Sequence, residues 1–414
     1  MLSKPKIIFV GDYSREDYVG LLEAAKGYCE FYFLFYASAN EEKSSLYKAY
    51  GKAIYWKDFK SAQQLLKAIS PDKVVLLYIE SYNHVVLNLA CRSAGVPTYL
   101  LEHGLRADYV FGFDPQISPG QENTLRNQAT RYYQIARDFI PRIKSRRFLN
   151  QSIKQLSPND QQFVNQFIEI RSKHNYLDTF RQIHSEKRLA DNYIGFSSKI
   201  LEAFEAHEAP YFGGNVNLIG IPYFDKLALL KPEAQTKSIL LIDQPLAEQG
   251  LLQWTKKYKE EFAAGLAAIC IKQGYQLYIK PHPKQKTSLW DKLERQGQCI
   301  VIDDEKLRQL APVIPVVLGF YSTYLMPFAA YTHTTVITYE KHPAGKYFLS
   351  KPLVDAGVAH PIHTLEELNI ILPDPEKLHQ RQLPNKVRFT EEWMYKFDGK
   401  SGERLRDILL STKP

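Results

Sequence analysis

The sequence contains few cysteines, and no two of them are close together. Its four cysteines are Cys29, Cys91, Cys270 and Cys299, in a chain of 414 residues. Zinc sites and redox motifs use cysteines a few residues apart, so the sequence predicts neither kind of site. We expect four buried thiols. Internal repeats and low-complexity tracts are also missing, which excludes a solenoid and a largely disordered chain.

Long apolar runs are missing as well. No stretch approaches the roughly 18 consecutive apolar residues that a spanning helix needs. Lys4, Asp12, Arg15 and Glu16 interrupt the first twenty residues, where a signal peptide would carry an apolar run. Hydrophobic residues make up 45% and charged residues 24% of the chain, which is typical of a folded soluble protein. We therefore expect a cytoplasmic protein.

Positive charge is concentrated in one segment. The chain has 53 basic and 45 acidic residues, a net charge of +8. Between Arg126 and Lys154, eight basic residues accompany only Asp138, a local net charge of +7. Such a cluster is either a solvated helical face or a docking site for an anionic partner. The eight residues are Arg126, Arg131, Arg137, Arg142, Lys144, Arg146, Arg147 and Lys154.

The partner that we expect for this segment is an anionic membrane surface or glycan. Aromatic platforms and motifs typical of nucleic-acid binding are not evident nearby, so we expect no nucleic acid. Contact with anionic lipid would make the protein peripheral on the inner face of the plasma membrane.

Apolar runs alternate with segments of helical period, which is typical of βαβ units and a parallel sheet. Residues 7–10 and 74–79 are expected strands. A helix over 83–93, followed by a strand over 98–101, completes one right-handed crossover. From about residue 121 to residue 174 the pattern indicates helices without a strand.

A second series of strands begins after Lys231-Pro232, where a polar run indicates a domain boundary. We expect an N-terminal domain over 1–230, with a helical insertion at about 121–185, and a C-terminal domain over 231–414 whose last helices cross back. Both domains should be doubly wound, so that functional residues directly follow strands. The other expected strands are 193–195, 216–219, 236–244, 276–279, 299–302, 313–319 and 335–338.

The first chemically informative strand end is Glu102-His103-Gly104. Carboxylate and imidazole are the side chains best suited to accept a proton near neutral pH, and glycine permits a sharp turn. A solvated loop is the competing interpretation. The position directly after an apolar strand favours a functional role.

The second strand end is Lys280-Pro281-His282-Pro283-Lys284. Two prolines restrict the backbone around His282 and give the imidazole a stiff support. A rigid histidine beside cations suits a phosphate leaving group, as a hydrogen-bond donor or general acid.

The third strand end runs from Gly319 to the adjacent hydroxyls of Ser322 and Thr323. A helix is expected to begin next, so these side chains could cap it. They could also bind phosphate together with backbone amides. The two interpretations are compatible.

Taken in this order, the three motifs resemble the signature of bacterial sialyltransferases and polysialyltransferases. Residues 238–246 also resemble the opening of the second domain in these families. The resemblance implies a GT-B fold, in which two Rossmann-like domains face a central cleft. It further implies an inverting transfer of a sialic acid-like, nonulosonic sugar from a CMP donor to a glycan or glycolipid, as in capsule or lipooligosaccharide synthesis. No metal or other cofactor is implied, and the chain has no Asp-x-Asp motif.

The resemblance assigns roles to individual residues. Glu102 or His103 would be the base that acts on the acceptor hydroxyl, with Glu102 favoured because the family pattern is acidic there. His282 would protonate or stabilise the departing CMP phosphate. The nucleotide and its phosphate would contact Lys280, Pro283, Ser322, Thr323 and Gln244.

Two alternatives stay open. The family pattern has a second acidic residue where this chain has His103, and a His-Gly pair is similar to that of the CDP-glycerol and CDP-ribitol phosphotransferases. In that related GT-B group the histidine acts as base, although its usual preceding aromatic residue is replaced here by Glu102. The remaining alternative is a non-catalytic scaffold of glycan assembly.

Overall fold

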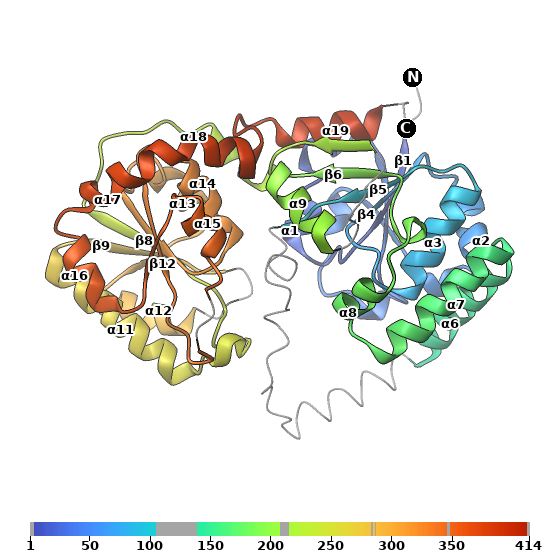
Figure 1. Cartoon of the computed structure of the whole chain (residues 1–414), viewed down its shortest axis with the longest axis horizontal. Coiled ribbons are helices and arrows are strands. Elements are labelled where there is room, and N and C mark those ends of the chain that lie inside the picture. The colour runs from blue at the N-terminus through green and yellow to red at the C-terminus, as the bar shows by residue number, and fades with distance from the viewer. Residues whose placement is uncertain are drawn as a thin grey trace. The chain divides into compact units, whose positions relative to one another are not determined.

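The computed structural model describes residues 4–104, 139–207, 215–282, 285, 287–345 and 348–411. Contacts divide the chain into two compact units. The described residues of the first unit run up to Tyr223 and resume at Lys400, and those of the second unit lie between Phe224 and Gly399. Each unit contains a parallel sheet with helices packed on it (Figure 1).

The two sheets are parallel throughout the described residues. The strand order is β3-β2-β1-β4-β5-β6-β7 in the first unit and β10-β9-β8-β11-β12-β13 in the second. The strands are β1 (Lys6–Val10), β2 (Glu30–Leu34), β3 (Gly51–Ile54), β4 (Lys73–Leu76), β5 (Thr98–Leu101), β6 (Asn192–Gly195), β7 (Asn215–Leu218), β8 (Ser238–Ile242), β9 (Gln276–Lys280), β10 (Ile300–Val301), β11 (Val316–Gly319), β12 (Thr335–Tyr339) and β13 (His360–Ile362).

The helices of the first unit include three that follow β5 in the chain, α6 (Phe139–Lys154), α7 (Pro158–Lys173) and α8 (Tyr176–Gln182). Its others are α1 (Glu16–Gly20), α2 (Ala62–Ile69), α3 (Tyr82–Ser93), α9 (Ser198–His207) and α19 (Ser401–Leu410). The second unit has α10 (Asp225–Ala228), α11 (Lys256–Gln273), α12 (Ser288–Arg295), α13 (Asp304–Leu310), α14 (Met326–Ala330), α15 (Lys351–Asp355), α16 (Leu368–Ile371), α17 (Pro375–Gln382) and α18 (Lys386–Phe389).

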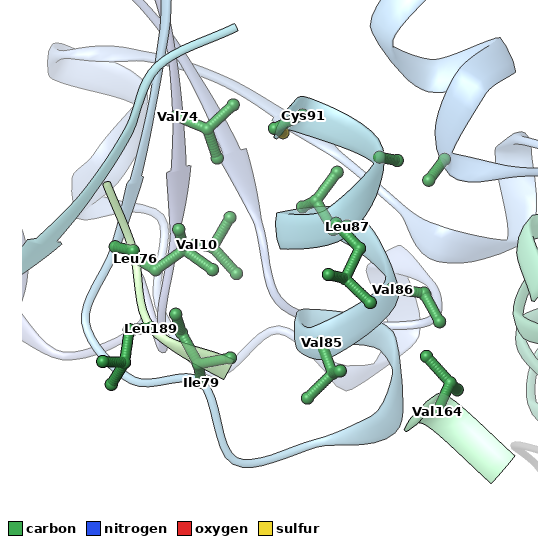
Figure 2. Packing of buried hydrophobic residues seen from close by; sticks show 14 of the residues in the cluster. Val10, Val74, Leu76, Ile79, Val85, Val86, Leu87, Cys91, Val164 and Leu189 are labelled. Atoms are coloured by element: carbon green, nitrogen blue, oxygen red, sulfur yellow. The ribbon is translucent and has the colours of Figure 1, made fainter. Parts of the chain in front are cut away.

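Helix α3 shows how the sequence forms the core of the first unit. The Ser81 hydroxyl accepts a hydrogen bond from the His84 amide and so caps the first turn. The helix is buried from His84 to Cys91, because the sheet covers one side and other helices cover the rest. Figure 2 shows Val10, Val74 and Leu76 of the sheet on one side of α3 and Val164 of α7 on the other.

The crossover predicted from the sequence is present. Helix α3 joins β4 to β5, and β5 has the predicted bounds. The predicted all-helical stretch contains α6 and α7 in its described part, and the residues before Phe139 lie outside the described part of the chain. Strands β2, β3 and β13 were not predicted from the sequence. Strand β3 is short, and β13 carries Pro361 at the edge of its sheet, which is where a strand tolerates proline.

His342 of the second unit is a structural histidine. Its ring is buried, and its Nδ1 accepts a hydrogen bond of 3.0 Å from the indole Nε1 of Trp254. Burial lowers the pKa of His342 to about 4. The imidazole must stay neutral to accept this hydrogen bond, so protonation of His342 opposes folding.

We predict that this histidine makes the protein sensitive to mild acid. The unfolded chain takes up the proton below pH 6.5, whereas the folded chain does so only near pH 4, so stability is lost as the pH falls between these values. From pH 7 to pH 5 the expected loss is about 2 kcal/mol.

Urea unfolding of His342→Gln at both pH values measures this contribution, because glutamine can still accept the indole hydrogen bond. The variant should lose less stability than the unchanged protein. His363→Gln is the control, since His363 is exposed. An unchanged pH dependence in His342→Gln would contradict the assignment.

Candidate active site

Three predicted motifs of the second unit lie at the carboxyl ends of neighbouring strands in its sheet. Strands β9, β8 and β11 are neighbours, and their registers place Lys280 beside Ile242 and Ile242 beside Gly319. The order in which the chain adds strands reverses between β8 and β11. From β8 the chain continues through β9 to β10 on one side of the sheet, and from β11 it continues through β12 to β13 on the other side. Open α/β sheets bind ligands at the carboxyl ends of the strands at such a switch point.

Gln244 spans this switch point. It follows β8, and its side-chain oxygen accepts a hydrogen bond of 3.1 Å from the backbone amide of Tyr321, which follows β11. The Gln244 amide in turn donates to Asp243 Oδ1 at 2.8 Å. Gln244 therefore fixes the loop that carries Ser322 and Thr323.

The loop at His282 is held by Gln285. The Gln285 side-chain oxygen accepts from the His282 amide at 3.0 Å, and the Gln285 amide donates to the His282 carbonyl at 2.8 Å. The Gln285 side-chain nitrogen donates to Asp243 Oδ2. The His282 ring is half-buried. Pro283 and Lys284 lie outside the described residues, so the bracing expected from Pro283 stays a prediction.

Asp243 connects these loops to the interior, and the sequence analysis did not single it out. Its buried carboxylate accepts from the Trp290 indole at 2.6 Å and lies 3.2 Å from the Lys259 ammonium. Lys259 is itself buried and also pairs with Glu248 at 2.8 Å. Burial raises the pKa of Asp243, while Lys259 and the donated hydrogen bonds oppose that rise. The available signal was an acidic residue directly after the apolar run of residues 239–242.

Lys280 is already paired. Its ammonium lies 3.1 Å from Asp304 and donates to the Pro281 carbonyl at 3.2 Å. Tyr324 completes the group, because its hydroxyl donates to Asp304 at 3.0 Å. Burial and the neighbouring Asp304 carboxylate raise the pKa of Tyr324. The Lys280 ammonium contributes positive charge at the strand end, and a bound anion would compete with Asp304 for it.

Ser322 fulfils the capping role that the sequence analysis expected. Its hydroxyl oxygen accepts from the Tyr324 amide at 3.2 Å and caps the short 3-10 helix Thr323–Leu325. The cap uses the hydroxyl as an acceptor and leaves its proton available for donation. Thr323 is half-buried beside it. The capping and phosphate-binding interpretations of Ser322 therefore remain compatible.

In the first unit, Glu102 and His103 follow β5 and differ in surroundings. Glu102 is buried, with Oε2 accepting from the Tyr193 hydroxyl of β6 at 2.7 Å and Oε1 accepting from the His103 amide at 3.0 Å. The His103 ring is half-buried and packs edge-on against Tyr18, with centroids 5.0 Å apart. The Tyr223 hydroxyl donates to the His103 carbonyl at 2.9 Å. Glu102 thus holds the backbone from which the imidazole projects.

Four tyrosines surround this pair, and sequence reasoning missed them because they come from distant segments. Tyr18 lies in α1, Tyr78 follows β4, Tyr193 lies in β6 and Tyr223 follows β7. Tyr78 also packs edge-on against His103, with centroids 6.0 Å apart. Burial raises the pKa of both Tyr78 and Tyr223, so both phenols keep their protons at neutral pH. The strand order β1-β4-β5-β6-β7 places the segments that carry these tyrosines around the end of β5.

Within the described ranges, no group of three or more histidine, cysteine, aspartate or glutamate side chains could hold a metal ion. None of the helices described here is both long enough and apolar enough to cross a bilayer.

Comparison with solved structures shows the fold. The wall teichoic acid polymerase TagF superposes with a TM-score of 0.51 at 13% identity, over 99% of this chain and 88% of that chain. The glycotransferase of kitacinnamycin superposes with a TM-score of 0.50 at 11% identity, over 99% of this chain and all of that chain. At such identities the likeness concerns the fold alone, which is the two-domain α/β GT-B fold of glycosyltransferases.

Comparison by sequence shows the family. No curated protein matches this sequence. The family model for alpha-2,8-polysialyltransferase matches residues 7–341, most of the chain. The match includes the strand ends at Glu102, Lys280 and Ser322. The chain therefore belongs to the alpha-2,8-polysialyltransferase family of glycosyltransferases.

Proposed function

We propose that this glycosyltransferase moves a sialic acid-like, nonulosonic sugar from a CMP donor to a cell-surface glycan or glycolipid. Capsule or lipooligosaccharide synthesis is the setting in which such a product is made. The observation that carries the proposal is the strand register of the second sheet, which pairs Ile242 with both Lys280 and Gly319. This register brings the motifs that follow β8, β9 and β11 together at the switch point. Family membership supports the sugar class.

The second unit is assigned the donor. A CMP phosphate brings negative charge, which the Lys280 ammonium would attract and the hydroxyls of Ser322 and Thr323 would bind. Pro283 would stiffen the loop that carries His282. Gln244 would position this binding surface through its bond to Tyr321. The His282 imidazole would donate a proton or hydrogen bond to the leaving phosphate.

The first unit is assigned the acceptor hydroxyl. The resemblance in sequence favours Glu102 as base, but the contacts favour His103. Both oxygens of the buried Glu102 carboxylate already accept hydrogen bonds from the protein, which suits this side chain to holding the strand end rather than to taking a proton from a substrate. An imidazole needs little adjustment to accept a proton near neutral pH. In this proposal His103 is the base and Glu102 is a positioning residue.

These assignments describe one displacement. His103 takes the acceptor proton while the acceptor oxygen forms a bond to the anomeric carbon. The bond from that carbon to the CMP phosphate breaks, and its electron pair leaves with the phosphate, where His282 supplies hydrogen-bonding or a proton. A single displacement inverts the anomeric centre. In this proposal cationic and hydroxyl groups of the chain stabilise the leaving group, and no metal takes part.

A second candidate is transfer of an alditol phosphate from a CDP-activated donor. The feature that favours it is His103 directly before Gly104 at the end of β5, the arrangement expected of a histidine base. Both candidates share a cytidine nucleotide and the same donor-side residues. They differ in the sugar and in whether a phosphate is transferred.

We predict that CMP stabilises the protein more than UDP or GDP does. A ligand at about 100 times its Kd adds about 2.7 kcal/mol to the stability of the folded state. A thermal-shift measurement with CMP, CDP, UDP and GDP at equal concentration checks this. Greater stabilisation by CDP than by CMP would favour the second candidate, and stabilisation by UDP or GDP alone would contradict both.

We predict that Gln285→Ala weakens CMP binding about tenfold, because the His282 backbone loses a hydrogen bond and Asp243 loses a donor. Gln276→Ala is the matched control, since Gln276 is exposed at the opposite end of β9. Calorimetric titration with CMP compares the two variants. Equal affinities would show that Gln285 does not hold the donor loop.

We predict that His103→Asn lowers kcat about 100-fold to 10,000-fold, the range of a lost general base. Glu102→Gln should lower it about tenfold or less, because the amide oxygen can still accept the His103 N–H bond. Turnover of a CMP-sialic acid donor with an oligosialic acid acceptor measures both. An inactive Glu102→Gln beside an active His103→Asn would return the role of base to the carboxylate.

A further inference from the structure

Helix α6 exposes several large apolar side chains together. Phe139 is 57%, Ile140 66% and Ile143 52% exposed. Among the described residues, no other helix or strand has more than one large apolar side chain that is exposed. Single exposed side chains of this kind are normal, whereas a contiguous group marks an interaction surface.

The opposite face of α6 fixes the helix to the first unit. Phe148, Leu149 and Ser152 are buried, and α6 packs against α3 and α7 (Figure 1). The Ser152 hydroxyl accepts a hydrogen bond of 2.8 Å from the Ala62 amide at the start of α2. At about 100° per residue, Ile143 points away from the centre of this packed face. The apolar group therefore projects outward from a rigid support.

Basic side chains border the apolar group. Arg142, Lys144, Arg146 and Arg147 are exposed, and α6 contains no acidic residue. In the part of the chain that the structure describes, no ion pair neutralises these four side chains. By helical geometry, Arg146 and Arg147 fall on the two sides of Ile143. The outward face thus has an apolar centre and cationic flanks.

We propose that this outward face of α6 lies in the headgroup region of an anionic lipid bilayer. Helices that bind in the plane of the membrane insert apolar side chains at the acyl boundary and direct basic side chains to the lipid phosphates. A soluble polyanionic glycan would engage the cations but would leave Phe139, Ile140 and Ile143 in water. The apolar centre therefore favours lipid over glycan.

This inference does not depend on the donor or on the reaction assigned above. It assigns anionic lipid as the partner of residues 139–154, the described part of the basic segment. A peripheral contact of this kind would keep the enzyme at the surface where glycolipid acceptors are anchored.

Vesicle binding by the full chain tests the proposal. Co-sedimentation with vesicles of phosphatidylcholine and phosphatidylglycerol is compared with co-sedimentation with phosphatidylcholine alone. The unchanged protein should bind the anionic vesicles. The variant Phe139→Ser/Ile140→Ser/Ile143→Ser should bind them about 100-fold more weakly or worse, because three apolar side chains that would be buried in the bilayer are lost. Arg146→Gln/Arg147→Gln should bind them about 20-fold more weakly, and added salt should remove that difference.

The matched control removes three exposed apolar side chains elsewhere. Ile271→Ser/Ile370→Ser/Val387→Ser alters residues that are 56%, 80% and 66% exposed, and its vesicle binding should not change. Anionic-vesicle binding that persists in the α6 serine variant would overturn the proposal. So would unchanged vesicle binding together with weakened binding of soluble oligosialic acid in the arginine variant, which would assign the face to the acceptor.

A second measurement avoids the multiple substitution. The four native cysteines are buried, so Ile143→Cys offers a single accessible thiol for a polarity-sensitive fluorophore. Anionic vesicles should shift the emission of this label to the blue, and a label on the Ile271→Cys variant should show no shift. Equal emission from the labelled Ile143→Cys variant with and without vesicles would place this face in water and overturn the proposal.

Discussion

The buried carboxylate of Asp243 is the constraint on which the strand ends of the second unit depend. It directly follows β8 at the switch point and accepts hydrogen bonds from the Gln244 backbone amide, Gln285 and Trp290. Through these partners one side chain fixes the loops after all three central strands. A buried charge is costly unless it is compensated, and Lys259 supplies the compensation from α11. Any change that breaks this group affects the geometry of the strand ends as well as stability.

The sequence predicted the carboxyl ends of β5, β9 and β11 to within one residue, whereas the predicted strands 74–79 and 236–244 run past the observed ends of β4 at Leu76 and β8 at Ile242. Residues 98–101 lie between Pro97 and Glu102, so the limits of β5 follow from the residues that border an apolar run. Gly95 adopts a left-handed conformation, with a φ of +69°, just beyond α3, as the expected end of that helix requires. The fold class followed from this alternation of strands and helices. Strand β2 shows the limit, because its aromatic residues carry no turn signal that distinguishes a strand from a buried helix.

The contacts of the site could not be predicted because they join distant segments. Nothing near Gln244 in the sequence indicates that its partner is the amide of Tyr321, and the same holds for Glu102 and Tyr193. These pairs depend on strand order, which the sequence pattern leaves open. The apolar character of the α6 face was likewise hidden, since Phe139 and Phe148 look equivalent until packing buries one of them and exposes the other.

The last helix gives the chain an interleaved architecture. Helix α19 belongs to the first unit, and the buried ammonium of Lys73 donates to the Ile408 carbonyl at its end. The polypeptide therefore leaves the first unit after Tyr223 and rejoins it at Lys400, so the second unit is formally an insertion within the first. A fragment ending at Gly399 would lack a helix of its own first unit, and the isolated first unit requires residues up to Tyr223 joined to the segment from Lys400 onward. A single cut in the chain therefore cannot separate the two units, because the first unit is made of two segments that flank the second in the sequence.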